Sequence, residues 1–308
     1  MPQHNADQQP GPIATTRSAR VSASRKLLRR SARRTAAAFL ADGPQAVREA
    51  LLYHGLGSTA SDEGEPPAHP NGLHVQVSEV YVDVQLKTRH ADLLALADKA
   101  GIRIVTGDAK AIASLSEAVT PQGIVARCAF LDLPLGAVLA GGPGRPRLIA
   151  VPVDVRDPGN LGTIIRCSDA AGADGVAVLG DSVDLYNAKT VRSSAGSIFH
   201  VPVAIEPDPV AGIKALRTAG LQIIATEGEA STDLDQFIDD GGLTTGTAWL
   251  FGNEAHGLPE EIAALADVRL RIPIQGLAES LNLSTAAAIC LFASARAQRR
   301  PASAQRGR

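Results

Sequence analysis

The sequence predicts an α/β protein with two domains, and three observations lead to this class. The chain has 308 residues, which at roughly 150 residues per domain favours two domains. Short apolar runs alternate with segments of helical periodicity in two separate series, a pattern typical of α/β architecture. Residues 133–146 lie between the two series and are rich in glycine and proline, so we expect them to be a linker.

The first series occupies residues 24–132 and describes a small α/β domain. Residues 1–23 precede it and are rich in Pro, Gln, Ser and Arg, a composition typical of disorder. The periodicity predicts helices up to residue 34 and at 44–52, 91–100 and 110–116, and strands at 37–41, 75–84, 103–105 and 124–130. Residues 55–72 are expected to form a loop rich in glycine, proline and acids, to which the sequence assigns no role.

The second series occupies residues 147–298. Strands are expected at 148–153, 175–179, 200–203, 222–226, 247–251 and 268–272, and helices at 161–171, 188–194, 209–219, 259–265 and 283–298. These strands are apolar on both faces, which indicates a mostly parallel sheet covered by helices on both sides. Trp249, the only tryptophan, lies in one of these strands and is expected in the core. Ligands of such sheets bind outside the carboxyl ends of the strands.

Basic residues gather at both ends of the chain, although the net charge is only -2. Asp7 is the only acid before Thr35, and that stretch holds a series of arginines and one lysine. Residues 299–308 form a basic tail without acids. Such blocks favour a polyanionic partner, most simply nucleic acid. The alternative is a pair of solvated tails that bind nothing.

The sequence indicates neither a membrane partner nor a metal. No apolar run approaches the roughly 18 residues that a membrane span needs. Three cysteines lie far apart, which argues against a zinc site and against disulfides and fits a reducing compartment: Cys128, Cys167 and Cys290. The apolar stretch after Arg33 and Arg34 leads into a patterned helix instead of a cleavage site, so we expect a cytoplasmic protein.

Polar residues stand in three loops at the ends of expected strands. In the first loop, residues 154–160, Asn160 is placed to cap the next helix, and Arg166 follows on that helix. In the second loop, residues 251–259, Glu254 lies between two glycines. Taken singly, Asn160 can be a mere cap, Arg166 a snorkelling surface residue and Glu254 a surface charge.

The third loop, residues 272–282, enters the final helix of the chain. Asn282 or Ser284 would cap that helix, and the helix itself is dominated by small side chains that permit close packing. A capped, buried helix alone explains this segment. His256 in the second loop is not expected to be catalytic, because no residue nearby in the sequence would orient it.

Taken together and in order, the three loops resemble the SpoU (TrmH-like) family of RNA ribose 2′-O-methyltransferases. The motifs that carry the resemblance are DPGNLGTIIRCSDAAG at 157–172, LFGNEAHGLP at 250–259 and IPIQGLAESLNLSTAAAI at 272–289. The resemblance covers about residues 148–298. It implies an α/β-knot methyltransferase domain, in which a deep trefoil knot is tied within the mostly parallel sheet fold. It also implies a homodimer that binds S-adenosylmethionine inside the knot.

The motif match also implies roles for individual residues. The polar catalytic set would be Asn160, Arg166, Glu254, Ser280 and Asn282. Contacts to S-adenosylmethionine would come from Thr226, Gly252, Ile272 and Leu281, with Gly257 and Pro273 shaping the pocket. A guanidinium has no acceptor and stays charged, so Arg166 is expected to hold a phosphate and stabilise the developing alkoxide, acting across the dimer. A phosphate oxygen or water would take the proton.

The first domain resembles the ribosomal-protein-like substrate-binding domain that many members of this family carry. The matching segments are FLADGPQAVREAL at 39–51 and TPQGIVA at 120–126. The expected function is methylation of a ribose 2′-hydroxyl in large-subunit (23S) rRNA. The alternatives are methylation of tRNA, a non-catalytic role in RNA binding or ribosome assembly, and a dinucleotide-binding enzyme, for which the glycine fingerprint is incomplete.

Overall fold

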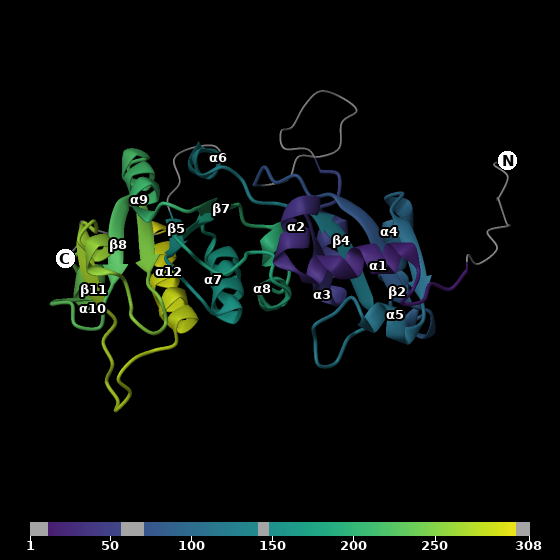
Figure 1. The fold of residues 1–308 in the computed structure, drawn as a ribbon. Coiled ribbons are helices and arrows are strands. Elements are labelled where there is room, and N and C mark those ends of the chain that lie inside the picture. Colours follow the sequence, from purple (N-terminus) through teal and green to yellow (C-terminus); the bar gives the residue numbers. More distant parts are fainter. Residues whose placement is uncertain (1–11, 57–70, 141–147, 300–308) are drawn as a thin grey trace, which may run out of the picture. The chain divides into compact units, whose positions relative to one another are not determined.

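The computed structural model describes residues 12–56, 71–140 and 148–299, which Figure 1 shows as a ribbon. The described residues divide into two compact units. Unit 1 holds residues 12–54 and 75–130, and unit 2 holds residues 131–140 and 148–299 together with 55–56 and 71–74. Most of the loop expected at 55–72 and nearly all of the C-terminal basic tail lie outside the described residues.

Unit 1 is a four-stranded sheet with helices, in the strand order β1-β4-β2-β3. Strands β2 and β3 are parallel, and the other two pairs are antiparallel. The elements are α1 (Ala19–Arg25), η1 (Lys26–Leu28), α2 (Arg30–Ala36), β1 (Ala38–Asp42), α3 (Pro44–Leu52), β2 (Val77–Asp83), η2 (Val84–Leu86), α4 (Ala91–Lys99), β3 (Arg103–Gly107), α5 (Ala109–Ala113) and β4 (Ile124–Ala129). Each predicted helix and strand of the first series has a counterpart here.

The expected disorder of residues 1–23 is wrong for its last part. The backbone N–H of Ala14 donates to the carbonyl of Thr106 at 2.8 Å, and helix α1 starts at Ala19. Val21 is fully buried in the core of unit 1. A few inward-facing residues therefore suffice to order a segment whose overall composition is polar. Residues 1–11 lie outside the described residues.

Unit 2 contains a sheet of seven strands in the order β7-β6-β5-β10-β8-β11-β9, and every neighbouring pair is parallel. The elements are α6 (Leu135–Ala140), β5 (Leu148–Pro152), α7 (Pro158–Ala171), β6 (Gly175–Leu179), α8 (Ala188–Ser193), η3 (Ser197–Phe199), β7 (Val203–Glu206), α9 (Pro209–Thr218), β8 (Gln222–Thr226), β9 (Thr232–Asp233), α10 (Leu234–Asp239), β10 (Thr247–Phe251), α11 (Glu260–Ala263), β11 (Val268–Arg271) and α12 (Leu283–Arg299). The predicted parallel sheet is confirmed.

Two local predictions for unit 2 are wrong, and two short elements were not predicted. The expected linker contains helix α6, because Leu135 and Val138 are spaced to bury one face in the core despite the glycines around them. The strand expected at 200–203 starts only at Val203, after the short helix η3. Strand β9 and helix α10 were not expected, because two and six residues are too few for a clear pattern, although Leu234, Phe237 and Ile238 have helical spacing.

The order of the strands brings the three loops together. The chain runs outward from β5 through β6 to β7, and then returns to β8 on the other side of β10. The direction of winding therefore reverses next to β5, and ligands of parallel sheets bind at such a switch point. Strands β5, β10, β8 and β11 are consecutive neighbours in the sheet. Their carboxyl ends carry the first loop, the second loop, Thr226 and the third loop.

Helix α12 packs against α7 and against strands β5 and β10, so the end of the chain covers the strands that bear the loops (Figure 1). Trp249 is fully buried, as predicted, and its indole N–H donates to the hydroxyl of Ser294 on α12 at 2.8 Å. The hydroxyls of Ser294 and Thr247 are 3.2 Å apart. Within the described ranges, no helix is both long and apolar enough to cross a membrane.

The Ser294 hydroxyl should be a measurable source of stability for unit 2. Ser294→Ala leaves the buried indole N–H of Trp249 without its acceptor, at a cost of about 1–3 kcal/mol in free energy of unfolding. Urea titration followed by Trp249 fluorescence measures this change in unit 2. Ser231→Ala removes an exposed hydroxyl from the same unit and should change the free energy by less than about 0.5 kcal/mol. Equal losses in the two variants would contradict this assignment.

Candidate functional site

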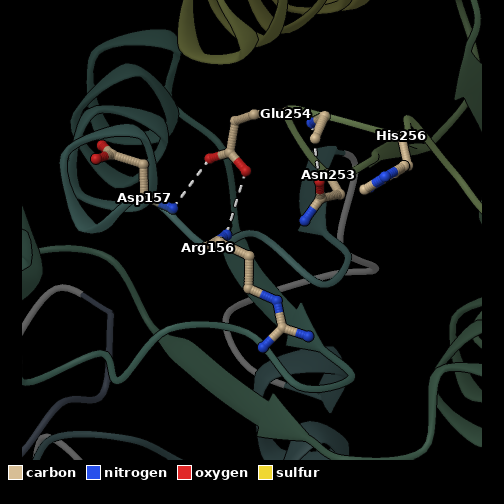
Figure 2. A pocket seen from close by; sticks show the side chains of 6 residues that line it. Arg156, Asp157, Asn253, Glu254 and His256 are labelled. Atoms are coloured by element: carbon tan, nitrogen blue, oxygen red, sulfur yellow. Dashed lines mark hydrogen bonds between the residues drawn. The ribbon is translucent and has the colours of Figure 1, made fainter.

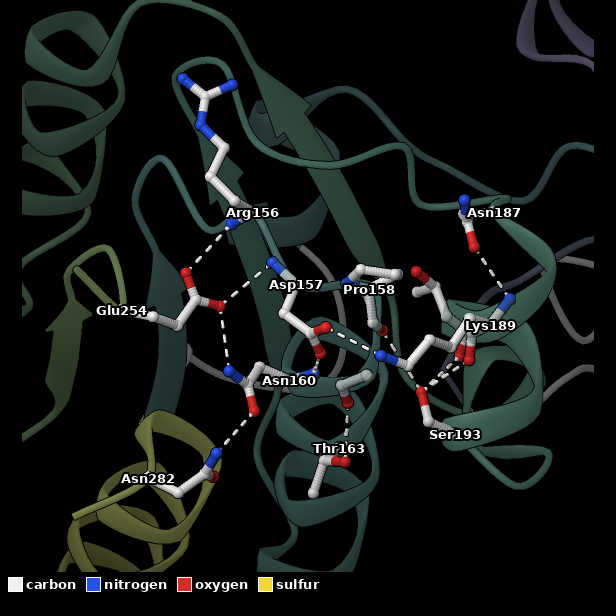
Figure 3. Close-up of polar contacts among 12 residues, drawn as sticks. Arg156, Asp157, Pro158, Asn160, Thr163, Asn187, Lys189, Ser193, Glu254 and Asn282 are labelled. Carbon is white, nitrogen blue, oxygen red and sulfur yellow. Dashed lines mark hydrogen bonds and ion pairs between the residues drawn. The ribbon is translucent and has the colours of Figure 1, made fainter.

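The carboxylate of Glu254, in the loop after β10, is the centre of the hydrogen bonds that join the three loops (Figure 3). One oxygen accepts from the backbone N–H of Asp157 at 3.1 Å and from the side-chain amide of Asn160 at 2.9 Å. The other oxygen accepts from the backbone N–H of Arg156 at 3.2 Å. Glu254 therefore fixes the turn between β5 and α7, although it is 94 to 98 residues away along the chain.

Asn160 relays this contact to the third loop. Its side-chain oxygen accepts from the side-chain amide of Asn282 at 3.0 Å. The oxygen of Asn282 in turn accepts from the backbone N–H groups of Ser284 at 3.0 Å and Thr285 at 3.3 Å, so Asn282 caps α12, as one of the two predicted options. The structure thus brings together three of the predicted polar residues, Asn160, Glu254 and Asn282.

The predicted cap of α7 is wrong by three residues. The helix starts at Pro158, and its N-cap is Asp157, whose carboxylate accepts from the backbone N–H of Asn160 at 2.9 Å. Proline at the first helical position, directly after an acid, is itself a start signal that could have placed the cap correctly. Because Asp157 caps the helix, the side chain of Asn160 is available to Glu254 and Asn282.

Both acids of this network stay charged. Partial burial raises the pKa of Glu254, but hydrogen bonds from Asn160 and from backbone N–H groups, including those of Arg156 and Asp157, outweigh it and lower the pKa below its ordinary value. The pKa of Asp157 is lowered chiefly by Lys189, whose ammonium lies 2.8 Å from the Asp157 carboxylate. A carboxylate that accepts several N–H groups favours its ionised form.

A pocket of about 510 Å³ opens beside Glu254 (Figure 2). Its lining comes from the first two loops: Arg156, Asp157, Asn253, Glu254, Ala255 and His256. The Arg156 guanidinium is held by the carboxylate of Asp181 at 2.7 Å. The sequence analysis did not select Arg156, which lies one residue before the first motif, or Asn253, which lies inside the second motif. It considered His256 and did not expect it to be catalytic. The pocket lies at the switch point of the sheet, where a ligand is expected.

The residues predicted to contact a cofactor lie along the same row of strand ends. Thr226 ends β8, and its hydroxyl donates to the carbonyl of Leu250 at 3.2 Å. A Cβ on Gly252 would come within 2.3 Å of the Gly257 carbonyl carbon, so only glycine lets the second loop fold back on its strand. Gly257 has φ 68°, which glycine adopts without strain.

The second loop closes on itself and on the first loop. The backbone groups of Asn253 and Gly257 exchange two hydrogen bonds of 2.9 Å. The side-chain amide of Asn253 donates to the carbonyl of Asp154 at 2.8 Å, and its oxygen accepts from the backbone N–H of Ala255 at 2.8 Å. Asn253 therefore sets the distance between the first two loops. These bonds give the loop after β10 a defined backbone.

In the third loop, Ile272 and Pro273 are half-buried, and Leu281 is 36% exposed. These apolar side chains therefore remain partly accessible from solvent. Two predicted polar residues are not drawn into the network. Ser280 and Arg166 are exposed, and within the described parts of the chain neither has a hydrogen bond or ion pair.

A metal site was not predicted, and among the described residues no group of three or more His, Cys, Asp or Glu could hold a metal ion. All three cysteines are unpaired: Cys128, Cys167 and Cys290. Burial raises the pKa of the Cys290 and Cys128 thiols, so these side chains are protonated members of the two cores. The candidate site is therefore built from carboxylate, amide, guanidinium and backbone groups.

Two family models match the chain. The SpoU rRNA Methylase family matches residues 147–292, which include all three loops. The model for RNA 2′-O ribose methyltransferase substrate binding matches residues 71–134, which make up much of unit 1.

Similar proteins cover both units to different extents, from 71% to 92% of this chain. The 23S rRNA (guanosine(2553)-2′-O)-methyltransferase RlmP of Bacillus subtilis is 30% identical over 281 residues, which are 91% of this chain and 97% of that protein. A 23S rRNA (guanosine-2′-O-)-methyltransferase RlmB of a Burkholderia species is 33% identical, over 71% of this chain and 88% of that protein. The solved structure of an AdoMet-bound rRNA methyltransferase from Sinorhizobium meliloti superimposes with a TM-score of 0.72 at 29% identity, over 92% of this chain and 97% of that one.

The ionised state of Glu254 should make unit 2 sensitive to acid. Since the folded-state pKa is lowered, the stabilisation is present above the pKa of glutamate in an unfolded chain, about 4.3, and is lost as the pH falls through the folded-state pKa. Glu254→Gln should lower the urea midpoint near pH 7, and its difference from wild type should shrink below about pH 4. Trp249 fluorescence reports both midpoints.

The matched control is Glu229→Gln, which neutralises an exposed acid that has no hydrogen bond within the described residues. This variant should follow wild type closely at every pH. A difference between Glu254→Gln and wild type that stays constant from pH 7 to pH 3 would show that the charge of Glu254 does not hold the loops.

Proposed function

The chain belongs to the SpoU rRNA methylase family, and from this premise we propose that it transfers a methyl group from S-adenosylmethionine to a ribose 2′-hydroxyl of 23S rRNA. The observation that carries the proposal is the hydrogen-bonded chain from Glu254 through Asn160 to Asn282. It joins the three family motifs at the switch point of a parallel sheet. The similarity to RlmP and RlmB supports 23S rRNA as the substrate in preference to tRNA.

The strand ends suit the cofactor chemically. S-adenosylmethionine has an adenine ring, which needs apolar neighbours and backbone hydrogen-bonding groups, and when bound it supplies a methyl group carried on a positively charged sulfur. Ile272, Pro273 and Leu281 offer accessible apolar surface, and Gly257 offers exposed backbone. The buried Gly252 lets the second loop fold back over its strand. We assign the cofactor contacts to these residues together with Thr226.

Asn160 and Glu254 position the reacting ribose and are not the base. The Glu254 carboxylate already accepts three N–H groups, and its lowered pKa makes it a poor proton acceptor. The Asn160 side chain uses one amide hydrogen on Glu254 and retains a second one. That hydrogen is available to a ribose oxygen, and the bonds to Glu254 and Asn282 fix the direction in which it points.

Arg166 is proposed to stabilise the developing alkoxide and to hold the adjoining phosphate. It is exposed on α7 and has no carboxylate partner within the described residues, so its planar fork is free for a phosphate. A guanidinium cannot accept the hydroxyl proton, and a phosphate oxygen or water takes it. Ser280, also exposed, would order the third loop over the bound substrates.

We further propose that the enzyme acts as a homodimer through α12. Thr285, Ile289, Phe292 and Arg296 follow helical spacing and form one exposed stripe. Ile289 is 38% and Phe292 45% exposed, and large apolar side chains grouped on one face mark interaction sites. Arg166 makes no contact with the Asn160–Glu254 network of its own chain, which fits its predicted action across the dimer.

Two further predictions remain proposals. The deep trefoil knot implied by the resemblance is supported by the packing of α12 on α7, β5 and β10, and the expected location is the cytoplasm. The principal alternative is a non-catalytic RNA-binding or assembly factor. The intact network among three distant loops favours catalysis, because binding alone does not require an oriented amide at the strand ends.

The activity is tested with purified protein, labelled S-adenosylmethionine and unmodified transcripts of 23S rRNA and of tRNA. We expect methyl transfer to 23S rRNA at a ribose oxygen. Arg166→Lys keeps the charge but loses the fork, and should lower kcat by about 100-fold with unchanged binding of S-adenosylmethionine. Arg217→Lys makes the same change on α9 and should retain activity. No transfer by wild type would overturn the proposed function, and near-normal turnover of Arg166→Lys would overturn the role of Arg166.

The dimer is tested by Phe292→Glu, which places a charge in the exposed apolar stripe of α12. Burying an unpaired carboxylate at an interface is costly, so this variant should sediment as a monomer at concentrations where wild type is a dimer, and its methyl transfer should fall with it. Val210→Glu changes an exposed apolar side chain of α9. It is the control and should leave the mass unchanged. A wild-type chain that sediments as a monomer would contradict the dimer without affecting the assignment of the reaction.

A further inference from the structure

The segment α1–η1–α2 of unit 1 presents a dense group of cations that the proposed reaction does not use. Residues 12–41 contain no acid. Seven basic residues of this stretch are exposed, and one of them, Arg20, is paired with Glu79. We refer to the other six as the arginine face: Arg17, Arg25, Lys26, Arg29, Arg30 and Arg34. Within the described parts of the chain, none of the six has a carboxylate partner. The face therefore carries unneutralised positive charge.

The opposite side of the segment is fixed to the core of unit 1. Val21 and Leu27 are buried there, and the hydroxyls of Ser24 and Tyr81 are 2.7 Å apart. Arg20 donates to the carboxylate of Glu79 at 2.8 Å. These packed residues alternate with the exposed cations along the sequence. Packing against the core therefore fixes the orientation of the helices that carry the cations.

Arg33 shows how the turn between the two helices is fixed. It is 4% exposed, and its guanidinium donates to the carbonyls of Leu27 and Leu28, both at 2.8 Å. A basic side chain that binds the last carbonyls of a helical turn stabilises that end. Arg33 is thus a structural residue in the middle of the basic segment, and sequence alone could not separate it from its exposed neighbours.

The acid that this segment contacts does not neutralise the face. Glu79 is 7% exposed and already binds Arg20, Tyr81 and, at 3.9 Å, Arg127. Burial and the hydrogen bond to Glu79 raise the pKa of Tyr81, so Tyr81 stays protonated as a donor. The Glu79 carboxylate therefore pairs with residues of unit 1 that do not belong to the arginine face.

Like charges on this face repel one another. Arg30 and Arg34 are four residues apart in α2, a spacing at which equal charges destabilise a helix. A bound polyanion would remove this repulsion and gain from the same potential. The face thus becomes more stable when phosphates neutralise it.

The composition of the face favours RNA phosphates over other anionic partners. Between Arg17 and Arg34 no large apolar side chain is exposed, whereas protein interfaces need apolar or aromatic anchors and membrane-surface helices need an apolar outer face. The segment also contains no aromatic residue on which a base could stack. Cations without stacking groups contact the backbone and do not read the bases.

We propose that the arginine face binds the phosphate backbone of the RNA substrate and supplies affinity that does not depend on base sequence. The face lies before residues 71–134, which match the substrate-binding family model, and so extends the RNA surface of unit 1 beyond that match. The identity of the RNA rests on the proposed function. The binding mode rests on the charges and packing of α1–η1–α2.

The test compares two triple variants of the full chain with equal changes in charge. R25Q/K26Q/R29Q removes three cations of the face. K99Q/R103Q/K110Q removes three exposed cations elsewhere in unit 1 and is the control. Dissociation constants are measured over a series of KCl concentrations for the unmodified 23S rRNA transcript and for a short RNA duplex of unrelated sequence.

For the face variant, we expect the slope of log K against log[salt] to become shallower by about 2, since each lost phosphate contact contributes roughly 0.7–0.9. Affinity at low salt should fall at least about tenfold on both RNAs, with unchanged binding of S-adenosylmethionine. The control should stay within about twofold of wild type. R30Q/R34Q, which removes the repelling pair of α2, should show the same direction of change without loss of thermal stability, and covers the case in which the triple variant does not fold.

Wild-type affinity and salt slope in the face variants would overturn the proposal and leave an acidic protein as the partner to seek. Equal losses in the face and control variants would also overturn it, because only the net charge would then matter. These outcomes are independent of methyl transfer. If wild type binds RNA through this face but transfers no methyl group, the proposed function fails and the binding surface stands.

Discussion

The bonds of the Glu254 carboxylate to the turn after β5 are the interaction on which the candidate site depends. Two backbone N–H groups and the Asn160 amide converge on it. Without an acceptor there, the N–H groups that lead into α7 would lose their partners, and Asn160 would lose the bond that directs its amide. Because the same carboxylate is ionised and fully engaged, the residue that organises the site is not free to act as its base.

This interaction is possible only because the sheet and one glycine bring its members together. Glu254 follows β10 and Asn160 follows β5, and these strands are parallel neighbours, so both loops leave the same edge. Gly252 allows the second loop to fold directly back over its strand, where any side chain would collide with backbone. The carboxylate then meets the start of α7. The hydrogen bonds of Glu254 therefore depend on the fold of the second loop, and that fold acts at this place only because β5 and β10 are neighbours in the sheet.

The sequence predicted the strands and the three loops, which depend on apolar periodicity and on the order of the motifs. It did not predict features that depend on one or two residues, such as a helix cap. Parallel strands and their loops followed from apolar runs, and the three motifs named Asn160, Glu254 and Asn282, whose side chains the structure joins by hydrogen bonds. The cap of α7 was misassigned to Asn160, because an Asn before an apolar run is also a good cap and Asp157 was not weighed against it.

Helix α6 was missed because glycine and proline dominated the composition around Leu135 and Val138, whose burial is a tertiary effect. Arg166 and Ser280 were not joined to this network, since neither has a hydrogen bond or ion pair within the described residues.

The pairing of cations distinguishes those that build the structure from those that remain available for a ligand. Lys189 is bound to Asp157, Arg217 to Asp267 and Arg156 to Asp181. These pairs are largely exposed and contribute orientation more than stability.

Arg166 and the six residues of the arginine face lack such partners within the described chain. On α7, the helix that bears Asn160, Arg166 is the only guanidinium and it is unpaired among the described residues, which suits a localised charge in a reaction. In unit 1 several unpaired cations share one surface, which suits a repeating polyanion. The two proposed kinds of RNA contact, one directional and one cumulative, thus follow from where the described chain neutralises its own charges and where it does not.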